Sequence, residues 1–320
     1  MKRTLLTLCG LCTLIAINMG GCEIVINPIQ TSADDEVDLS PADVAAIGKL
    51  TIDWENGAID IQVDETATEL SIKADRRVGG VSVISAEEAL DDWNIRVIVD
   101  EDEPPNVTLR FNKPSKAFVY RANLQIVVPT TEGIFIENDN GDIDVDGNAA
   151  KTVVDLSNGD VTITNQTGNT TIETDNGRVE VDSLDGDVEI QTDNGRITVD
   201  AANGSVTATA ENGQIQIDSA GGNVDAETDN GEIEIAAQPL ENGFVKAYSS
   251  FGRLTIRVPA DFAADLTLET EFGAVDADLS DFETANVVTT VRKVTAELNG
   301  GGGLIRGQTE LGGIDFDSLP

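Results

Sequence analysis

The central part of the chain repeats a nine-residue pattern in which turn residues alternate with a short amphipathic segment. The pattern runs without a gap from residue 129 to residue 236, which is twelve units. Positions 2 to 4 of a unit carry Asp, Asn and Gly, residues that tolerate positive φ and form turns. Positions 6 and 8 are mostly Val, Ile or Ala, whereas positions 5, 7 and 9 are mostly polar. Each unit therefore predicts one strand with a single buried face.

Asn-Gly pairs indicate that two units make one structural repeat. They recur every 18 residues, with the asparagines at Asn140, Asn158, Asn176, Asn194, Asn212 and Asn230. An antiparallel β-meander would place a hairpin turn at each pair, whereas a parallel β-solenoid would stack equivalent residues of successive coils. We favour the solenoid because its two sheets cover each other, while a long meander leaves one apolar face open. The predicted fold is all-β, a parallel β-solenoid (β-helix- or β-roll-like) of about 18 residues per coil, with the antiparallel β-meander as the alternative.

Modified units flank the regular stretch. Residues 54–62 fit the frame before it, and residues 249–257, 270–278 and 309–317 fit it afterwards. Terminal units of a repeat array are usually atypical because they cap the stack. In the later units Phe251, Phe272 and Leu311 replace the turn asparagine. We expect the longer inserts nearby to pack over these apolar residues.

The nine-residue frame is lost between residues 62 and 128. Ser85 and Glu88 form a capping-box pattern, which predicts a short helix from Ser85 through Trp93. Strands are predicted over residues 94–99, 106–111 and 118–128.

The N-terminus has the pattern of an export signal. Lys2 and Arg3 precede an apolar stretch over residues 5–19, which is too short to favour a permanent membrane span. The Gly20-Gly21-Cys22 sequence that follows resembles the lipobox of bacterial lipoproteins, in which the cysteine carries the lipid. Cys22 is therefore the predicted lipidation site, and it is also the one cysteine left after the signal is removed.

These patterns divide the chain into five parts. We predict a signal peptide over residues 1–21 and a lipid anchor and tether over 22–48, the latter from its acidic segment and Pro41. An irregular N-terminal β cap with a short helix follows over 49–128. The regular solenoid spans 129–236, and modified C-terminal coils span 237–320.

The charge of the chain limits its partners. Without the signal, 18 Lys+Arg stand against 58 Asp+Glu, a net charge of −40, which repels nucleic acid and attracts divalent cations. In a solenoid Asp182, Asp200 and Asp218 would stack about 4.8 Å apart. They are weak candidates for binding a metal ion; the favoured interpretation is a solvated acidic surface without a bound metal or other cofactor.

A catalytic site is not expected. The chain has no His, the commonest general base. Arg178 and Arg196 fall in a regular column of outward-facing positions. They do not come together with a pair of carboxylates, as a catalytic site would require. The strict calcium-binding nonapeptide is also absent, because Val or Ile stands where that repeat needs Asp.

The strand over residues 124–129, followed by phased Asn-Gly units, resembles a domain-of-unknown-function family labelled "putative adhesin". The resemblance covers residues 50–316 and implies a parallel β-helix or β-roll on a bacterial envelope, with no established catalytic residues. We therefore expect an exported, membrane-anchored, non-enzymatic lipoprotein, periplasmic or surface-exposed, acting in adhesion, scaffolding or envelope sensing. Its partners would be the membrane and an envelope protein or polysaccharide. The alternatives are a polysaccharide-binding or polysaccharide-cleaving β-helix and a calcium-binding surface repeat protein.

Overall fold

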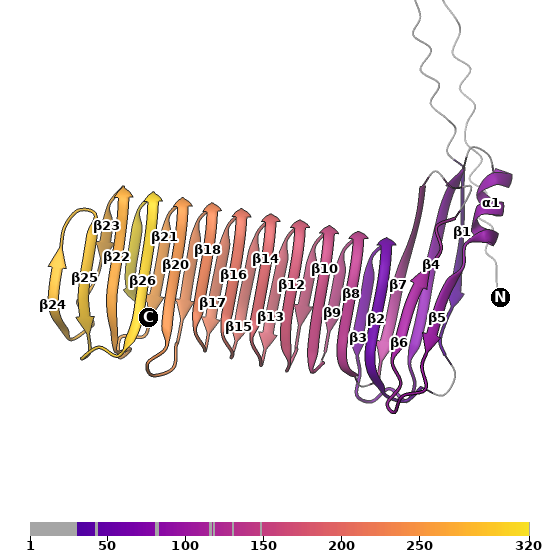
Figure 1. The fold of residues 1–320 in the computed structure, drawn as a ribbon, viewed down its shortest axis with the longest axis horizontal. Coiled ribbons are helices and arrows are strands. Elements are labelled where there is room, and N and C mark those ends of the chain that lie inside the picture. The colour runs from indigo at the N-terminus through magenta and orange to yellow at the C-terminus, as the bar shows by residue number, and fades with distance from the viewer. Residues whose placement is uncertain are drawn as a thin grey trace, which may run out of the picture.

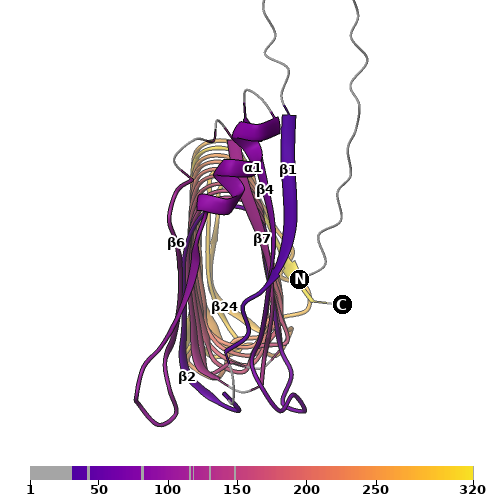
Figure 2. The same cartoon turned by 90° about the vertical axis from the view of Figure 1, so that its right-hand side faces the viewer.

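Two facing β-sheets make up most of the computed structural model, which describes residues 31–41, 44–80, 83–114, 117, 119–129, 131–147 and 149–319. The strands stack side by side along a rod (Figure 1), and the view along the rod shows the two sheets on either side of a flattened interior (Figure 2). Sheet A has 13 strands, in the spatial order β1 (Thr31–Asp38), β4 (Ser71–Gly80), β7 (Val119–Val128), β3 (Ile59–Val63), β9 (Ile143–Asp146), β11 (Val161–Thr164), β13 (Val179–Leu184), β15 (Ile197–Ala202), β17 (Ile215–Ala220), β19 (Ile233–Ala237), β21 (Leu254–Val258), β27 (Ile314–Ser318) and β23 (Val275–Ala277). Sheet B has 14 strands, in the order β24 (Thr284–Thr289), β25 (Lys293–Leu298), β22 (Ala264–Phe272), β26 (Gly303–Leu311), β20 (Phe244–Phe251), β18 (Val224–Asn230), β16 (Val206–Asn212), β14 (Val188–Asn194), β12 (Asn169–Asn176), β10 (Lys151–Asn158), β8 (Thr131–Asn140), β2 (Ile47–Asn56), β6 (Val107–Phe111) and β5 (Ile95–Val99).

The regular stack is a parallel solenoid of 18 residues per coil. Asn176 of β12 is paired with Asn194 of β14, and Asn194 with Asn212 of β16, all in parallel register. This confirms the predicted solenoid and excludes the meander. The alternation of the sequence explains the core, because Val179 and Val181 point inward and are fully buried while Glu180 between them is exposed.

Each coil contains two turns. The Asn-Gly turn leads from sheet B to sheet A, and the return turn leads back to sheet B. Glycine is required in the Asn-Gly turn because stacked turns approach closely: a Cβ on Gly213 would lie 1.5 Å from the carbonyl oxygen of Gly195. The return turn instead uses positive φ at non-glycine residues, with Asn165 and Ser183 at +57° and Ala201 at +52°.

Both ends of the rod place coils out of sequence order. At the N-terminal end the coil β2–β3 lies between β6–β7 and β8–β9, although it precedes both in the chain. At the C-terminal end the last coil, β26–β27, is inserted between β20–β21 and β22–β23. The antiparallel hairpin β24–β25 then covers β22.

The N-terminal cap differs from the sequence prediction in its first strand, in its helix and in the starts of two further strands. Residues 31–38, which were expected in the tether, form β1 and pair antiparallel with β4. The helix α1 (Val83–Asp92) begins two residues before Ser85, so Ser85 lies inside the first turn and does not cap it. The observed strands β5 and β6 each begin one residue later than predicted. No helix among the described residues is long and apolar enough to span a membrane.

Candidate binding surface

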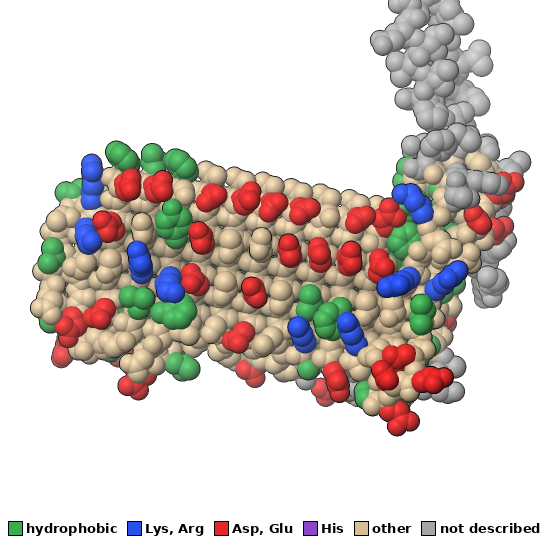
Figure 3. Space-filling view, in the orientation of Figure 1, with side chains coloured by type: hydrophobic (Ala, Val, Ile, Leu, Met, Phe, Trp, Pro, Cys, Tyr) green, Lys and Arg blue, Asp and Glu red, His purple; other side chains and the backbone are tan. Residues whose placement is uncertain are grey.

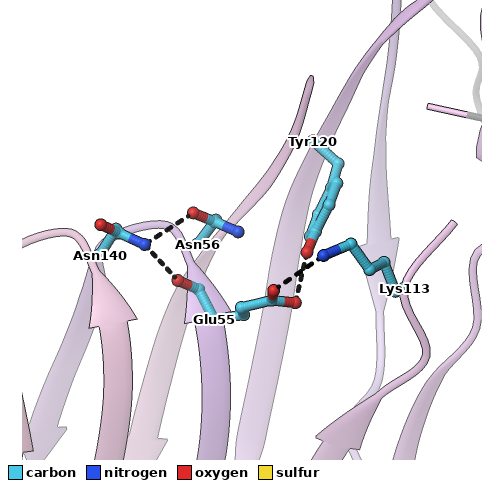
Figure 4. Close-up of polar contacts among 5 residues, drawn as sticks. All are labelled: Glu55, Asn56, Lys113, Tyr120 and Asn140. Carbon is cyan, nitrogen blue, oxygen red and sulfur yellow. Dashed lines mark hydrogen bonds and ion pairs between the residues drawn. The ribbon is translucent and has the colours of Figure 1, made fainter. Parts of the chain in front are cut away.

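A ladder of asparagine side chains runs along the edge of the rod formed by the Asn-Gly turns. The ladder starts in the N-terminal cap, where Asn140 Nδ2 donates to Asn56 Oδ1 at 3.1 Å and to the Glu55 carbonyl at 3.3 Å (Figure 4). Five further amide-to-amide bonds of 3.0–3.3 Å join, one after another, Asn140, Asn158, Asn176, Asn194, Asn212 and Asn230. In-register parallel strands bring identical side chains to the strand spacing at which amides bond in series. The ladder makes this edge a fixed polar surface.

Carboxylates beside the ladder bond the backbone of the next coil. Asp142 Oδ1 accepts the N–H of Asp160 at 3.0 Å, and Asp160 Oδ1 accepts the N–H of Arg178 at 2.8 Å. In the return turn Asp187 Oδ1 accepts the N–H of Ser205 at 2.8 Å. These bonds offset the mutual repulsion of acidic residues that lie only one coil apart.

The outer face of sheet B carries rows of acidic side chains along the rod (Figure 3). One row joins Asp53, Glu137, Asp155 and Glu173 on successive strands. The regular stretch of residues 129–236 has 24 Asp+Glu and three Lys+Arg, so it holds −21 of the net charge. The 18-residue repeat could have placed Glu137, Asp155 and Glu173 in one column. Only Asp53 required the structure, because it joins the row through the displaced coil β2–β3.

The structure brings the predicted metal candidates onto adjacent strands. Asp182 is paired with Asp200, and Asp200 with Asp218, on the outer face of sheet A. Over the described part of the chain, no group of three or more Asp, Glu, Cys or His residues is arranged to hold a metal ion. Asp218 instead accepts a hydrogen bond from Gln216 Nε2 at 2.8 Å, and Asp182 accepts one from Ser183 Oγ at 3.0 Å.

Asp146 lies in the same column of sheet A, two coils before Asp182. Its carboxylate accepts hydrogen bonds from Asn165 Nδ2 at 2.7 Å and from Thr164 Oγ1 at 2.8 Å. These two bonds, the one from Asn165 first, lower the pKa of Asp146 below its usual value. The polar neighbours thus fix one carboxylate of the column in its charged form.

An apolar ridge ends the ladder at the C-terminal end of the rod. Phe251, Leu311 and Phe272 occupy successive coils in the column of the turn asparagines, since Asn230 is paired with Phe251. The expectation that nearby inserts pack over them is wrong: the three residues are 54%, 53% and 64% exposed. The loop between β24 and β25 lies beside the Phe272 turn, where the Arg292 carbonyl accepts the Thr270 N–H at 2.9 Å, but it does not bury these side chains. Hydrophobic side chains are visible there at the upper left of Figure 3.

A small polar cluster joins the N-terminal cap to the first rung of the ladder. Tyr120 Oη donates to Glu55 Oε2, and Lys113 Nζ lies 3.1 Å from Glu55 Oε1 (Figure 4). Burial, followed by the hydrogen bond to Glu55, raises the pKa of Tyr120. The hydrogen bonds to Tyr120 and then Glu55 raise the pKa of Lys113. Tyr120 also contacts Trp93 with ring centroids 5.7 Å apart, so the cluster fastens the cap to the stack.

Position 1 of the repeat, to which the sequence analysis assigned no role, holds a buried hydroxyl column. Ser249 Oγ donates to the Gly231 carbonyl at 3.0 Å, Thr270 Oγ1 to Gly312 at 2.9 Å and Thr309 Oγ1 to Gly252 at 3.1 Å. All three side chains are at most 2% exposed. Thr228 Oγ1 makes the same kind of bond to the Gly213 carbonyl at 3.2 Å, whereas the buried hydroxyls of Thr174 and Thr192 in this column have no hydrogen-bond partner among the described residues. The recurrence of Thr or Ser at position 1 was the signal for the column.

Several solved structures resemble the chain over most of its length. A search of solved structures finds an adhesin labelled putative from Bacteroides fragilis (12% identity, 91% of this chain and 99% of that chain, TM-score 0.35) and another from Parabacteroides merdae (10%, 89% and 96%, TM-score 0.34). A lipid binding protein, also labelled putative, from Parabacteroides distasonis matches with 11% identity over 89% of this chain and 96% of that chain, at a TM-score of 0.32. These TM-scores are below 0.5, so none of the three supports an inference here.

No curated protein sequence shows significant similarity to the chain. Cys22, the predicted lipidation site, lies outside the described residues. The family model described as Toastrack DUF4097 matches residues 98–297, which is more than half of the chain. The chain belongs to the Toastrack DUF4097 family, a domain of unknown function.

Proposed function

We propose that this protein is a non-enzymatic binding protein of the cell envelope, acting in adhesion or scaffolding. Its rod presents an interaction surface away from a lipid-anchored N-terminus. The observation that carries the proposal is the position of the apolar ridge. β1, the first described strand, lies at one end of the rod, and the ridge lies near the other (Figure 1). The eleven coils from β6–β7 to β22–β23, both included, extend about 50 Å at the spacing of neighbouring strands.

The chemistry of the ridge favours a protein partner. Three apolar side chains in a row, each more than half exposed, form the kind of patch that marks an interaction site on a soluble surface. Arg292 lies with its guanidinium carbon 5.8 Å from the Phe272 ring centroid and supplies a charged rim. The acidic faces behind it keep partners of like charge away from the stack.

A binding isotherm on isolated envelope tests this proposal. The mature chain from residue 22, carrying Cys22→Ser so that no lipid contributes, should bind saturably. Phe272→Asp should weaken binding at least tenfold, because it places a charge inside the apolar row. The matched control is Ile98→Asp, which changes an exposed apolar residue at the opposite end of sheet B and should leave binding intact. Equal binding by all three proteins would show that the ridge has no such role.

Lipidation of Cys22 has its own experiment. The wild-type chain should take up labelled fatty acid and sediment with membranes, and Cys22→Ser should release it into the soluble fraction. Uptake of no label, with Cys22→Ser still bound to membranes, would contradict the anchor while leaving the ridge proposal open to its own isotherm.

A second candidate function is weak binding of divalent cations along sheet A. It is supported by the adjacent carboxylates of Asp182, Asp200 and Asp218. Millimolar Ca²⁺ should then raise the melting temperature more than Na⁺ at matched ionic strength, and the triple Asn variant should lose the excess. Equal shifts for the two cations would indicate screening alone.

A further inference from the structure

The strand β24 is the open edge of sheet B at the C-terminal end of the rod. It pairs with β25 on one side only, and it is the outermost strand in Figure 1. All six of its residues are exposed, including Val287 at 46% and Val288 at 56%. An edge strand of this kind presents unpaired backbone N–H and C=O groups to a strand from another molecule. Charged side chains, which commonly blunt such an edge, are absent from Thr284–Thr289.

The charges on either side of β24 are arranged to complement a second copy. Residues 284–291 carry no charge, Glu283 stands immediately before them and Arg292 immediately after. Two β24 strands that pair antiparallel about Val287 and Val288 therefore bring Glu283 of each copy to the Arg292 end of the other. The contact is related by a two-fold axis, so both ends gain an attractive pair.

The acidic stack disfavours side-by-side contact between two copies. The stack of residues 129–236 alone carries a net charge of −21, so two rods repel each other side by side. Residues 284–296 contain Arg292 and Lys293 and no acidic residue. Lys293 Nζ is already held 3.0 Å from Glu269 of its own chain, and Arg292, whose guanidinium carbon lies 5.8 Å from the Phe272 ring centroid, is the other cation at this edge.

We propose that β24 pairs antiparallel with β24 of a second copy and joins the B sheets of two rods end to end. The inference goes beyond the proposed envelope function, because it requires neither the lipid anchor nor the apolar ridge. The bulge between Ala285 and Val288 shortens the regular strand. The dimer is therefore weak, with a dissociation constant on the order of 10 µM. In this dimer the two N-terminal caps lie at opposite ends of a doubled rod.

Sedimentation equilibrium of the mature chain from residue 22 with Cys22→Ser tests the pairing. The mass should rise from monomer to dimer as the concentration passes through tens of micromolar. Val288→Lys should hold the protein monomeric, whereas Ile98→Lys, on the edge strand at the opposite end of sheet B, should dimerise normally. Unchanged melting temperatures show that each variant is folded.

Reversing the charges at Glu283 and Arg292 tests the register of the two paired β24 strands. Glu283→Arg and Arg292→Glu should each be monomeric alone, because like charges meet at both ends of the pair. An equimolar mixture of the two should form a heterodimer, in which every end again joins opposite charges. A wild type that stays monomeric at 200 µM would overturn the inference. A Val288→Lys dimer or a mixture that does not associate would do the same.

Discussion

The middle of the rod and its two ends solve the same stacking problem in different ways. From β8 to β19 each coil lies beside the coil that precedes it in the chain, and every turn from sheet B to sheet A carries Asn-Gly. At the ends, coils are inserted out of order, and aromatic side chains replace repeated amides: Trp54, Trp93, Phe111 and Tyr120 form one cluster, and Phe282 contacts Phe316. The middle propagates by local repetition, whereas each end closes the sheets with contacts between segments far apart in sequence.

Charge divides along the same boundary. The middle has three Lys+Arg against 24 Asp+Glu, while residues 49–128 have nine against 15 and residues 237–320 have six against 13. Ion pairs form at the ends of the rod, where the basic residues are more frequent. Arg76 lies 2.6 Å from Asp35 in the cap, and Arg257 lies 2.9 Å from Glu234 where the last coils begin. Regular amide and backbone bonds hold the middle together, whereas the ends also use pairs of opposite charge.

Close contact between turns in the middle gives the largest expected effect. Gly213→Ala would place a Cβ 1.5 Å from the Gly195 carbonyl oxygen, so neighbouring coils must separate. We expect a loss of about 3 kcal/mol or more in the free energy of unfolding, measured by urea denaturation. Gly313→Ala is the control, at the residue after a turn glycine, where the atom nearest to an added Cβ is 3.5 Å away. Equal losses from both substitutions would show that the close approach of stacked turn glycines is not the cause.

The asparagine ladder should show a graded effect. Asn194 makes two ladder bonds, of 3.2 and 3.1 Å, so Asn194→Ala should lower the free energy of unfolding by about 1–2 kcal/mol. Asn230 makes one ladder bond, at the end next to Phe251, and Asn230→Ala should lose about half as much. Thermal unfolding of the two variants measures the ratio. A larger loss for Asn230 would mean that the ladder does not stabilise the stack in series.

In the cap, Tyr120→Phe removes the hydroxyl that donates to Glu55. We expect a loss of about 1 kcal/mol in the free energy of unfolding near neutral pH. Because the pKa of Tyr120 is raised in the fold, its contribution is complete below its ordinary pKa of 10.0 and is lost as pH rises through the folded pKa. Plots of the free energy of unfolding against pH for the wild type and for Tyr120→Phe should therefore converge in strong alkali. Curves that stay parallel through that range would contradict this role.

The smallest effect is a gain in the middle of the rod. Ala201 has φ of +52° in a return turn, a conformation that strains a residue with a Cβ. Ala201→Gly should raise the free energy of unfolding by about 0.5–1 kcal/mol, after the greater chain entropy of glycine is subtracted. Ala201→Asn should give a smaller gain in the same direction. Asn165 occupies the equivalent position of an earlier return turn with a φ of +57°. A loss in melting temperature for both variants would show that the turn is not strained.

The sequence by itself determined the regular part of this protein. The 18-residue recurrence and the period-two alternation specify which side chains face inward, because in-register parallel strands map a repeat in sequence onto a column in space. Asn176, Asn194 and Asn212 could be placed in one column for this reason, and Asp182, Asp200 and Asp218 in another.

Only the tertiary structure decided the ends and the surfaces formed there. No local pattern shows that β26–β27 inserts before β22–β23, or that residues 31–38 complete sheet A, because those pairings join segments separated by long stretches of chain. The order of coils in turn brings Phe251, Leu311 and Phe272 together and leaves them exposed. Repetition fixes neighbours that are one period apart, whereas closure of the stack depends on which distant segments bury the remaining apolar edge.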